Sequence, residues 1–187
     1  MARRPTKQPT FDTKRLRVRP YRPSDLKPLH ALYGDPANLR YWGVGPSRDI
    51  GDTRKMLPWH LGFRPRHYVL WAVEYKKSGR MIGMINCHRR DLREKRVDVG
   101  WLILPEFQGK GLMNEAARAL LRHLFDDLGV HKVEALIRAE NKPSAALAKR
   151  LGFRLEGGPI RDRWLVLGRW HSVMLYGLIA GEERSPK

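Results

Sequence analysis

The feature that most constrains the fold is one segment, residues 97–117 (VDVGWLILPEFQGKGLMNEAA), in which an apolar run passes through a glycine turn into an amphipathic stretch. Val97–Leu104 is short and almost wholly apolar, which predicts a buried strand. From Leu112 to Leu128 apolar residues recur at helical spacing, and Gly129 follows as an end signal for the helix. A strand that leads into a helix of this kind predicts layers in which helices cover a sheet.

Strand and helix patterns alternate over the rest of the chain. Further strands are expected at Leu16–Tyr21, Tyr68–Tyr75, Met81–His88, Lys132–Ile137, Phe153–Glu156 and Arg169–Ile179. Further helices are expected at Leu26–Tyr33, Ser47–Leu61 and Pro143–Leu151, with Pro58 as a point where the second could break. This order predicts an α/β (α+β mixed) class, with a mixed sheet and crossover connections near residues 97–156.

The net charge of +18, from 37 Lys and Arg against 19 Asp and Glu, bears on which partners the protein attracts. The electric field of so basic a protein attracts polyanions, so RNA, ribosomes and phosphorylated cofactors are expected binding partners. A composition that uses arginine as a solubilising residue explains the same charge. Cys87 is the only cysteine, which excludes an internal disulfide framework and fits the reducing cytoplasm. No apolar run approaches the roughly 18 residues that span a bilayer, so we expect a cytoplasmic protein without membrane contact.

The glycine turn has the chemistry of an anion-binding loop. Gly109 and Gly111 flank Lys110 at the start of the long helix, where main-chain N–H groups lack partners and the helix dipole favours negative charge. A Walker loop is excluded because Leu112 follows Gly111, and a dinucleotide fingerprint is weak because Asn114 occupies its sixth position. A glycine turn without a ligand remains the alternative on these residues alone.

Residues 108–112 (QGKGL) resemble the Q/R-x-x-G-x-G/A signature of the GNAT acetyltransferases, with Met113 standing where Gly or Ala is usual. The segments LPEFQGKGLMNEA, AENKPSAALAKRLGFRLEG, GRWHSVMLYGLI and TKRLRVRPYRPSDLKPL are similar to the RimJ/RimL-type branch, the ribosomal-protein N-terminal acetyltransferases. The resemblance covers residues 11–180 and implies a single GNAT domain there, between a basic flexible arm (1–10) and a polar tail (181–187). It implies a largely antiparallel central sheet of about seven strands, flanked by about four helices, with a splayed central pair of strands.

The resemblance also implies acetyl-coenzyme A as cosubstrate and assigns residues to its parts. Leu102, Ile103 and Leu104 would offer main-chain groups to the pantetheine arm, and an N–H near Ile103–Leu104 would meet the oxyanion. The pyrophosphate would be wrapped by Gln108, Gly109, Lys110, Gly111, Leu112, Met113 and Asn114. Asn141 and Ser144 would lie near the sulfur, although both residue types also favour helix starts. Lys149 or Arg150 would reach the adenosine phosphates.

Acetyl transfer needs a neutral amine, a stabilised oxyanion and a proton or hydrogen bond for the leaving sulfur. By the resemblance, Asp98 is the base candidate, directly or through water, and Ser144 the donor to the sulfur. Cys87 and His88 are adjacent on an expected strand, so they point to opposite faces and cannot form a nucleophilic dyad. The seven histidines show no ligand spacing, so no metal is expected. Further candidates for the acceptor cleft, all with equally plain packing roles, are Tyr41, Trp42, His67, Trp170 and His171.

The leading functional hypothesis is N-acetylation of a protein N-terminal α-amine, with the basic surface docking on assembled ribosomes. The alternatives are acetylation of a small-molecule amine or amino acid, and a basic RNA-binding module on the same fold. Because acidic residues are scarce, we expect polycationic drugs to be poorer acceptors of the acetyl group than neutral or anionic amines. The lack of an RNP-like or G-x-x-G signature argues against the RNA module. A monomer or a homodimer is expected.

Overall fold

The computed structural model describes residues 7–65, 68–91 and 93–182. Most of the expected arm (1–6) and tail (183–187) and the candidate His67 lie outside these ranges, so the arm and the tail stay predictions. The strands are β1 (Phe11–Asp12), β2 (Leu16–Arg19), β3 (Tyr68–Tyr75), β4 (Arg80–Asp91), β5 (Arg96–Ile103), β6 (Lys132–Arg138), β7 (Arg154–Val166) and β8 (Arg169–Ile179). The helices are α1 (Leu26–Tyr33), α2 (Ile50–Leu61), α3 (Leu112–Arg122) and α4 (Lys142–Leu151).

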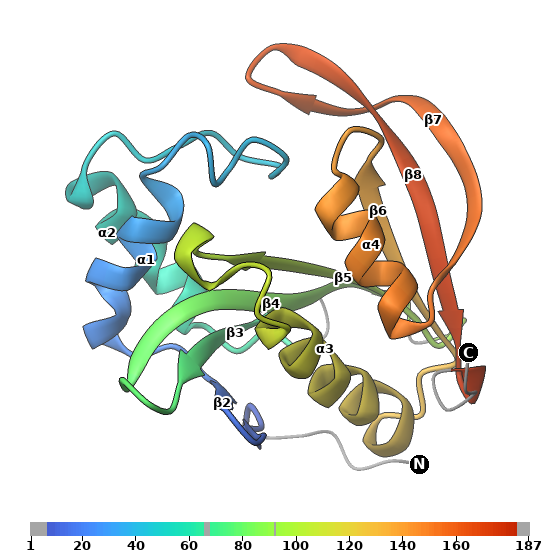
Figure 1. The fold of residues 1–187 in the computed structure, drawn as a ribbon, viewed down its shortest axis with the longest axis horizontal. Coiled ribbons are helices and arrows are strands. Elements are labelled where there is room, and N and C mark those ends of the chain that lie inside the picture. The colour runs from blue at the N-terminus through green and yellow to red at the C-terminus, as the bar shows by residue number, and fades with distance from the viewer. Residues whose placement is uncertain (1–6, 66–67, 92, 183–187) are drawn as a thin grey trace.

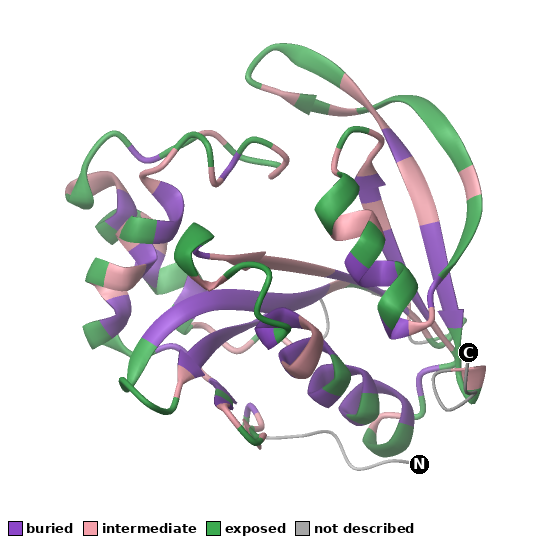
Figure 2. Cartoon of the chain, in the orientation of Figure 1, coloured by how far each residue is buried: buried purple, intermediate pink, exposed green. Residues whose placement is uncertain are grey.

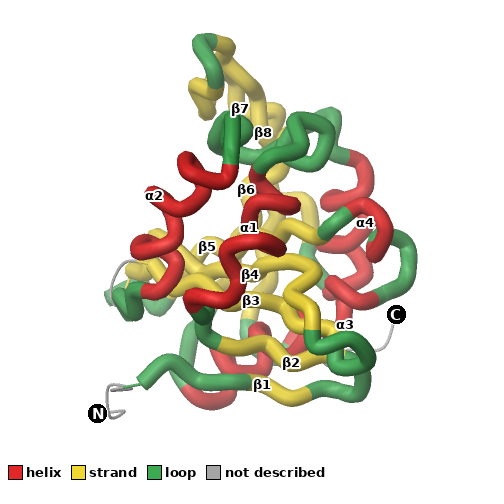
Figure 3. The backbone as a smooth tube through the Cα atoms, turned by 90° about the vertical axis from the view of Figure 1, so that its left-hand side faces the viewer, coloured by secondary structure: helices red, strands yellow, loops and turns green. Residues whose placement is uncertain are grey.

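One sheet of eight strands in the order β1-β2-β3-β4-β5-β6-β8-β7 forms the centre of the described chain (Figures 1 and 3). Its pairs are antiparallel except for β5 and β6, which run parallel. The expected mixed, largely antiparallel sheet with four helices is therefore confirmed. Eight strands are found rather than about seven, because Phe11–Asp12 adds a short edge strand to β2.

Helices cover both faces of the sheet, as the alternation along β5 shows. Val97 and Val99 belong to the core that contains the α3 and α4 side chains, whereas Leu102 packs against the core under α1 and α2. Successive side chains of a strand point to opposite faces, so a wholly apolar strand needs cover on both sides. Figure 2 shows this central region as the most buried part of the molecule.

The helix that the apolar spacing placed at 112–128 ends earlier than expected. Leu112, Leu120 and Leu124 are buried as the spacing predicts, and each such leucine stabilises the fold by about 1.5–3 kcal/mol. Regular helix stops at Arg122, and a wider π turn covers residues 123–127, in which the Leu128 N–H donates to the His123 carbonyl. This turn keeps Leu124 in the core, so the apolar pattern continues although the α-helix does not.

Two other boundaries differ from the sequence-based expectation. The second helix begins at Ile50, where Asp49 Oδ1 accepts from the Asp52 N–H over 2.9 Å, and it continues through Pro58 without a break. The strand expected to end at Glu156 instead runs to Val166, because it pairs along its length with β8 through three irregularities in register. The resulting hairpin of β7 and β8 projects beyond the rest of the sheet (Figures 1 and 3).

A buried ion cluster ties the first loop to the sheet. Arg19 Nη1 and Nη2 donate to Asp25 Oδ2 and Oδ1 over 2.7 and 2.8 Å, and its Nε donates to Glu74 Oε2 over 2.6 Å. The side chains of Arg19 and Asp25 are only 4% and 5% exposed. Removing one member would leave a buried charge without its partner, which makes the cluster a firm anchor for the start of α1.

Candidate functional site

The central feature of the site is a gap between the two parallel strands. β5 and β6 pair only at Arg96–Asp98 and Lys132–Glu134. Beyond these residues β5 stays paired with β4 as far as Ile103, and β6 stays paired with β8 as far as Arg138. The two strands therefore diverge while each keeps its outer neighbour, which leaves unpaired main-chain edges facing each other across the gap. The splayed central pair expected from the sequence is thus present.

The register decides which main-chain groups face this gap. The Leu104 N–H donates to the Ile82 carbonyl over 2.9 Å, so these residues form a hydrogen-bonded pair. Alternation along an antiparallel pair then turns Leu102 toward β4, and turns the main-chain groups of Trp101 and Ile103 toward the gap. Of the two N–H groups expected near the oxyanion, that of Leu104 already has a partner in Ile82, whereas that of Ile103 faces the gap, as does the N–H of Trp101.

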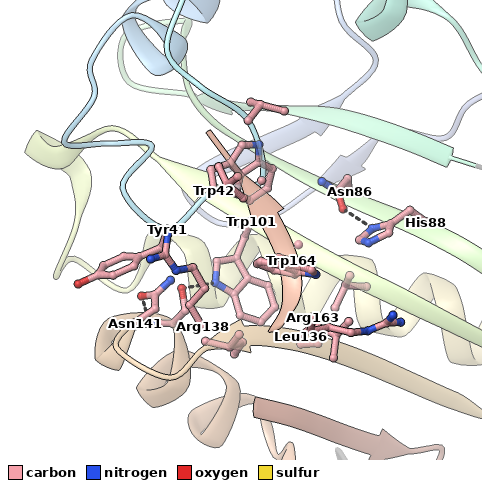
Figure 4. Close-up of a pocket in the computed structure, with 18 of the residues that line it drawn as sticks. Tyr41, Trp42, Asn86, His88, Trp101, Leu136, Arg138, Asn141, Arg163 and Trp164 are labelled. Atoms are coloured by element: carbon pink, nitrogen blue, oxygen red, sulfur yellow. Dashed lines mark hydrogen bonds between the residues drawn. The ribbon is translucent and has the colours of Figure 1, made fainter. Parts of the chain in front are cut away.

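A cavity of about 430 Å³ opens at the gap (Figure 4). Its walls come from four parts of the chain: the loop between α1 and α2, strands β3, β4 and β5, strand β6 with the start of α4, and strand β7 of the β7–β8 hairpin. Aromatic side chains dominate it, namely Tyr41, Trp42, Tyr68, Trp101 and Trp164. The volume lies within the range of pockets that hold small ligands or one end of a larger one.

The side chains of Asn86 and Trp42 both lie close to Gly100 on β5. A Cβ at Gly100 would lie 3.1 Å from Asn86 Oδ1 and 3.4 Å from Trp42 Cη2. A side chain here would press mainly on Asn86, whereas the Trp42 indole lies at ordinary contact distance. Tyr41 and Trp42, named from the sequence as candidates for acceptor contact, both line the cavity.

The glycine loop before α3 has the backbone geometry of an anion nest. Gly109 and Gly111 have φ values of 72° and 71°, a left-handed conformation that favours glycine. Gly111 is the N-cap of α3 and provides no side-chain cap. In the described part of the chain no residue accepts from the main-chain N–H groups of residues 111–114, which are the four that a helix start leaves unpaired. Such a loop fits a phosphate or pyrophosphate.

The side chains around this loop hold its shape. Lys110 Nζ donates to the Glu106 carbonyl over 2.7 Å, and Gln108 Nε2 donates to the Ile103 carbonyl over 3.3 Å. Arg15 Nη1 donates to the Lys110 carbonyl over 2.9 Å, and its Nε pairs with Glu115 Oε2 at 2.7 Å. The loop is therefore tied both to the end of β5 and to the second strand.

Asn141 and Ser144 have a structural role and also line the cavity. Asn141 is the N-cap of α4, and its Oδ1 accepts from the Ser144 N–H over 3.2 Å. Ser144 Oγ accepts from Trp101 Nε1 over 3.3 Å. Because the indole N–H occupies one acceptor position of this oxygen, the hydroxyl proton of Ser144 stays free to donate into the cavity.

Asp98 lies at the closed end of the gap, on the face opposite Ser144. It is buried, its Oδ2 lies 3.3 Å from Arg89 Nη1 and 3.9 Å from His88 Nε2, and it does not line the cavity itself. Burial raises the pKa of Asp98 above its usual value, against the lowering effect of the Arg89 charge. Burial, followed by the Arg89 charge, lowers the pKa of His88 to about 4. His88 is therefore neutral at pH 7 and lies between Asp98 and the cavity.

Several lining residues carry no signal in the sequence. Asn86, His88, Arg138, Arg163 and Trp164 meet only because distant segments fold together (Figure 4). One hint of the cavity was present in the sequence, namely the aromatic residue after Gly100: Trp101 lines the cavity from β5.

Other named candidates lie away from the cavity. Cys87 faces the α3 side of the sheet, opposite His88, as expected. Trp170, His171 and Lys149 are not among its lining residues. Within the described ranges no group of three or more His, Cys, Asp or Glu side chains is arranged to hold a metal ion. Every helix in these ranges is too short or too polar to span a bilayer.

Comparison with known proteins identifies relatives. Residues 15–154 match the sequence profile of a family described as "Acetyltransferase (GNAT) domain". YdaF of Bacillus subtilis (strain 168), provisionally named a ribosomal N-acetyltransferase, is 34% identical over 110 residues, which are 59% of this chain and 60% of that protein. The spermidine N(1)-acetyltransferase of Escherichia coli (strain K12) is 25% identical over 161 residues, covering 85% of this chain and 83% of that one.

A solved structure shows the same fold. The spermidine N-acetyltransferase from Vibrio cholerae, in complex with CoA and spermine, superposes with a TM-score of 0.78. The superposition covers 92% of this chain and all of that one, at 21% sequence identity. At this identity the likeness concerns the fold alone.

Proposed function

The chain belongs to the GNAT acetyltransferase family, and from this premise we propose that it is a RimJ/RimL-type enzyme that moves an acetyl group from acetyl-coenzyme A to a protein N-terminal α-amine. The observation that most supports this proposal is the gap between β5 and β6, which has a glycine loop after β5 and an aromatic cavity beside it. Direct attack within a ternary complex suits this arrangement, because donor and acceptor can meet in the gap from opposite faces of the sheet.

The donor side is assigned to the α3 and α4 face. The free N–H groups of residues 111–114 fit the pyrophosphate of acetyl-coenzyme A, and the unpaired edge of β5 fits the pantetheine arm. Acetyl-coenzyme A supplies a reactive thioester, which is the source of the acetyl group. The main-chain N–H groups at Trp101 and Ile103 are the donors that we assign to the oxyanion.

The acceptor side is assigned to the opposite face, where Tyr41, Trp42 and His88 line the cavity. A peptide α-amine has a pKa near 8, against about 10.4 for lysine, so a modest base is enough to deprotonate it. We assign this role to Asp98. Because Asp98 does not reach the cavity, the proton passes by way of His88 or a water molecule.

Proton delivery to the leaving sulfur is assigned to Ser144. Its Oγ accepts from the Trp101 indole, which orients the hydroxyl and leaves its proton for the thiolate. A serine hydroxyl is a poor acid, so we expect it to act as a hydrogen-bond donor or relay rather than as a strong acid.

Acetylation of a small-molecule amine is the second candidate function. The cavity of about 430 Å³ is large enough for a whole small acceptor, and one relative is a spermidine acetyltransferase. A module that only binds RNA is disfavoured, because the sequence has neither an RNP-like nor a G-x-x-G signature.

The surface charge supports docking on an RNA-rich particle such as the assembled ribosome. The chain carries a net charge of +18, and each phosphate contact releases counterions, so binding to ribosomes is expected to weaken steeply as salt rises. Binding that is insensitive to salt would contradict this part of the proposal.

The activity test is acetyl transfer to a peptide with a free N-terminus, and the rate is measured from the free thiol that coenzyme A releases. Asp98→Asn and Ser144→Ala are expected to lower kcat while acetyl-coenzyme A still binds. Ser78→Ala, in the exposed turn between β3 and β4, is the control and is expected to match the wild type. Release of thiol without acetylated peptide would contradict the assigned acceptor.

A further inference from the structure

The charges of the cavity wall point to the chemistry of the acceptor. Among the described residues that line it, the charged side chains are Arg89, Arg138 and Arg163, and neither Asp nor Glu is present. His88 adds no charge at neutral pH because its pKa is lowered to about 4. The wall is therefore cationic, which opposes a polycationic acceptor and favours an anionic one.

The charge of Arg89 is already paired with a carboxylate of the protein. Its Nη1 lies 3.3 Å from Asp98 Oδ2, and Asp98 is buried behind it. This pair leaves Arg138 and Arg163 as the cations available to a ligand.

Arg138 is held in place by packing and by one hydrogen bond. Its side chain is 12% exposed and stacks on Tyr41, with the guanidinium carbon 5.6 Å from the ring centroid. Nη1 donates to the Arg40 carbonyl over 2.8 Å, whereas the buried Nε has no hydrogen-bond partner. Glu140 Oε2 lies 3.7 Å from this nitrogen, which makes a long ion pair rather than a hydrogen bond, and the pair is weak because Glu140 is 59% exposed. Because Nε is itself buried, a carboxylate would contact this cation at the partly exposed end of its guanidinium, which the Tyr41 ring and the Arg40 carbonyl hold in place.

Arg163 approaches from a different element. It lies on β7 beside Trp164, within the part of the hairpin that lines the cavity (Figure 4). Within the described ranges no acidic group pairs with it. The two arginines thus come from strands on either side of β8, and both contribute to the same cavity.

We infer that the acceptor of this enzyme carries an anionic group close to its reactive amine, in the form of an acidic peptide N-terminus with Asp or Glu among its first residues, recognised by Arg138 and Arg163. The inference rests on the proposed acetyltransferase function and narrows its substrate class. It separates this chain from a polyamine acetyltransferase, since spermidine would bring further positive charge to a cationic wall. A free acidic amino acid offers the same chemistry from another source.

The test compares peptides of one length that differ only at the second residue, with Asp, Asn or Lys. Transfer from acetyl-coenzyme A is expected to give a kcat/KM about tenfold higher for Asp than for Asn, the size of one charge-assisted hydrogen bond, and lowest for Lys. Free aspartate and glutamate form a second arm. Transfer to them at a rate above that of the acidic peptide would assign the anion to a free amino acid instead. Spermidine forms a third arm, and transfer to it at a rate equal to the Asp peptide would overturn the inference.

Variants of the two arginines test whether they produce the preference for the Asp peptide. Arg163→Gln and Arg138→Gln are expected to reduce the ratio of Asp to Asn peptide toward one while the Asn peptide is still acetylated. Arg161→Gln is the control, because Arg161 is exposed on the same strand and does not line the cavity. A loss of selectivity in Arg161→Gln equal to that in Arg163→Gln would overturn the assignment to the cavity.

A binding measurement distinguishes failure of this inference from failure of the proposed function. Quenching of tryptophan fluorescence by the same peptides, measured without acetyl-coenzyme A, reports the charge preference without catalysis. Preferential binding of the Asp peptide with no transfer to any acceptor would support the anion site and contradict the enzyme activity. Transfer to the Lys peptide at a rate equal to that of the Asp peptide would support the activity and contradict the anion site.

Discussion

The phosphate loop makes a prediction that separates binding from stability, because α3 is followed by a second glycine of similar geometry. Gly111 has φ 71° at the start of the helix, and Gly129 has φ 61° beyond its far end. A Cβ at Gly111 would meet only Arg15 Nη2, at 3.6 Å, and a Cβ at Gly129 would meet nothing within 4 Å. Alanine therefore brings backbone strain at either position, without steric clash.

The expected cost in stability is the same for both variants. An L-residue in the left-handed region costs about 1–2 kcal/mol. The entropy of unfolding for 187 residues is about 0.4 kcal/mol/K, so each variant is expected to lower Tm by about 3–5 °C.

The expected effect on the ligand differs. In Gly111→Ala the loop relaxes away from positive φ and turns N–H groups out of the nest. Loss of one charge-assisted hydrogen bond costs about 1.5–3 kcal/mol, so the Kd for acetyl-coenzyme A is expected to rise about ten- to a hundredfold. Gly129→Ala is expected to keep the wild-type Kd. Calorimetric titration beside thermal unfolding measures both quantities. Wild-type affinity in Gly111→Ala, or an equal loss of affinity in Gly129→Ala, would show that the left-handed Gly111 is not needed for binding acetyl-coenzyme A.

Three other predictions concern the relay, the pH response and the buried ion cluster. Ser144→Ala is expected to lower kcat about tenfold or more without changing the KM for acetyl-coenzyme A, measured by steady-state kinetics; an unchanged kcat would remove Ser144 from the mechanism. For His88, the pKa is about 6.5 in the unfolded chain and about 4 in the folded one, so stability falls as the pH drops through that window because only the unfolded chain takes up the proton. His88→Gln is expected to lose less Tm than the wild type between pH 7 and pH 5, and an equal loss would contradict the lowered pKa. Arg19→Met is expected to cost about 3–5 kcal/mol of unfolding free energy by leaving Asp25 without its guanidinium partner and Glu74 with only Arg22, 3.7 Å away, and denaturant titration showing less than about 1 kcal/mol would contradict the buried cluster.

Local patterns predicted most of the fold. The apolar stripe from Leu112 and the glycines before it depend on neighbouring residues, so periodicity and turn chemistry were enough to place α3 and its loop. The end of α3 was misplaced because a π turn keeps the same residues buried as a continued helix would. The extension of β7 to Val166 was missed because residues 157–159 (Gly-Gly-Pro) interrupt the alternation that predicts a strand.

The candidate site was only half predictable, for a physical reason. The loop at Gly111 lies within one strand–helix connection, whereas the cavity joins Trp42, Trp101, Arg138 and Trp164 from segments far apart in the chain. The opening itself depends on where β5 and β6 cease to pair, which is a property of the whole sheet. Leu104 shows the same limit, since only the register reveals that its N–H is already bonded to Ile82.

The most direct test of the central claim is to find where the acetyl group goes. The protein is incubated with acetyl-coenzyme A and a peptide that carries a free N-terminus and an internal lysine, and fragmentation in a mass spectrometer locates the modification. We expect acetyl on the α-amine, no acetyl on a matched peptide with a blocked N-terminus, and loss of transfer with Gly111→Glu. Acetyl found only on the lysine, or equal modification by Gly111→Glu, would contradict this expectation.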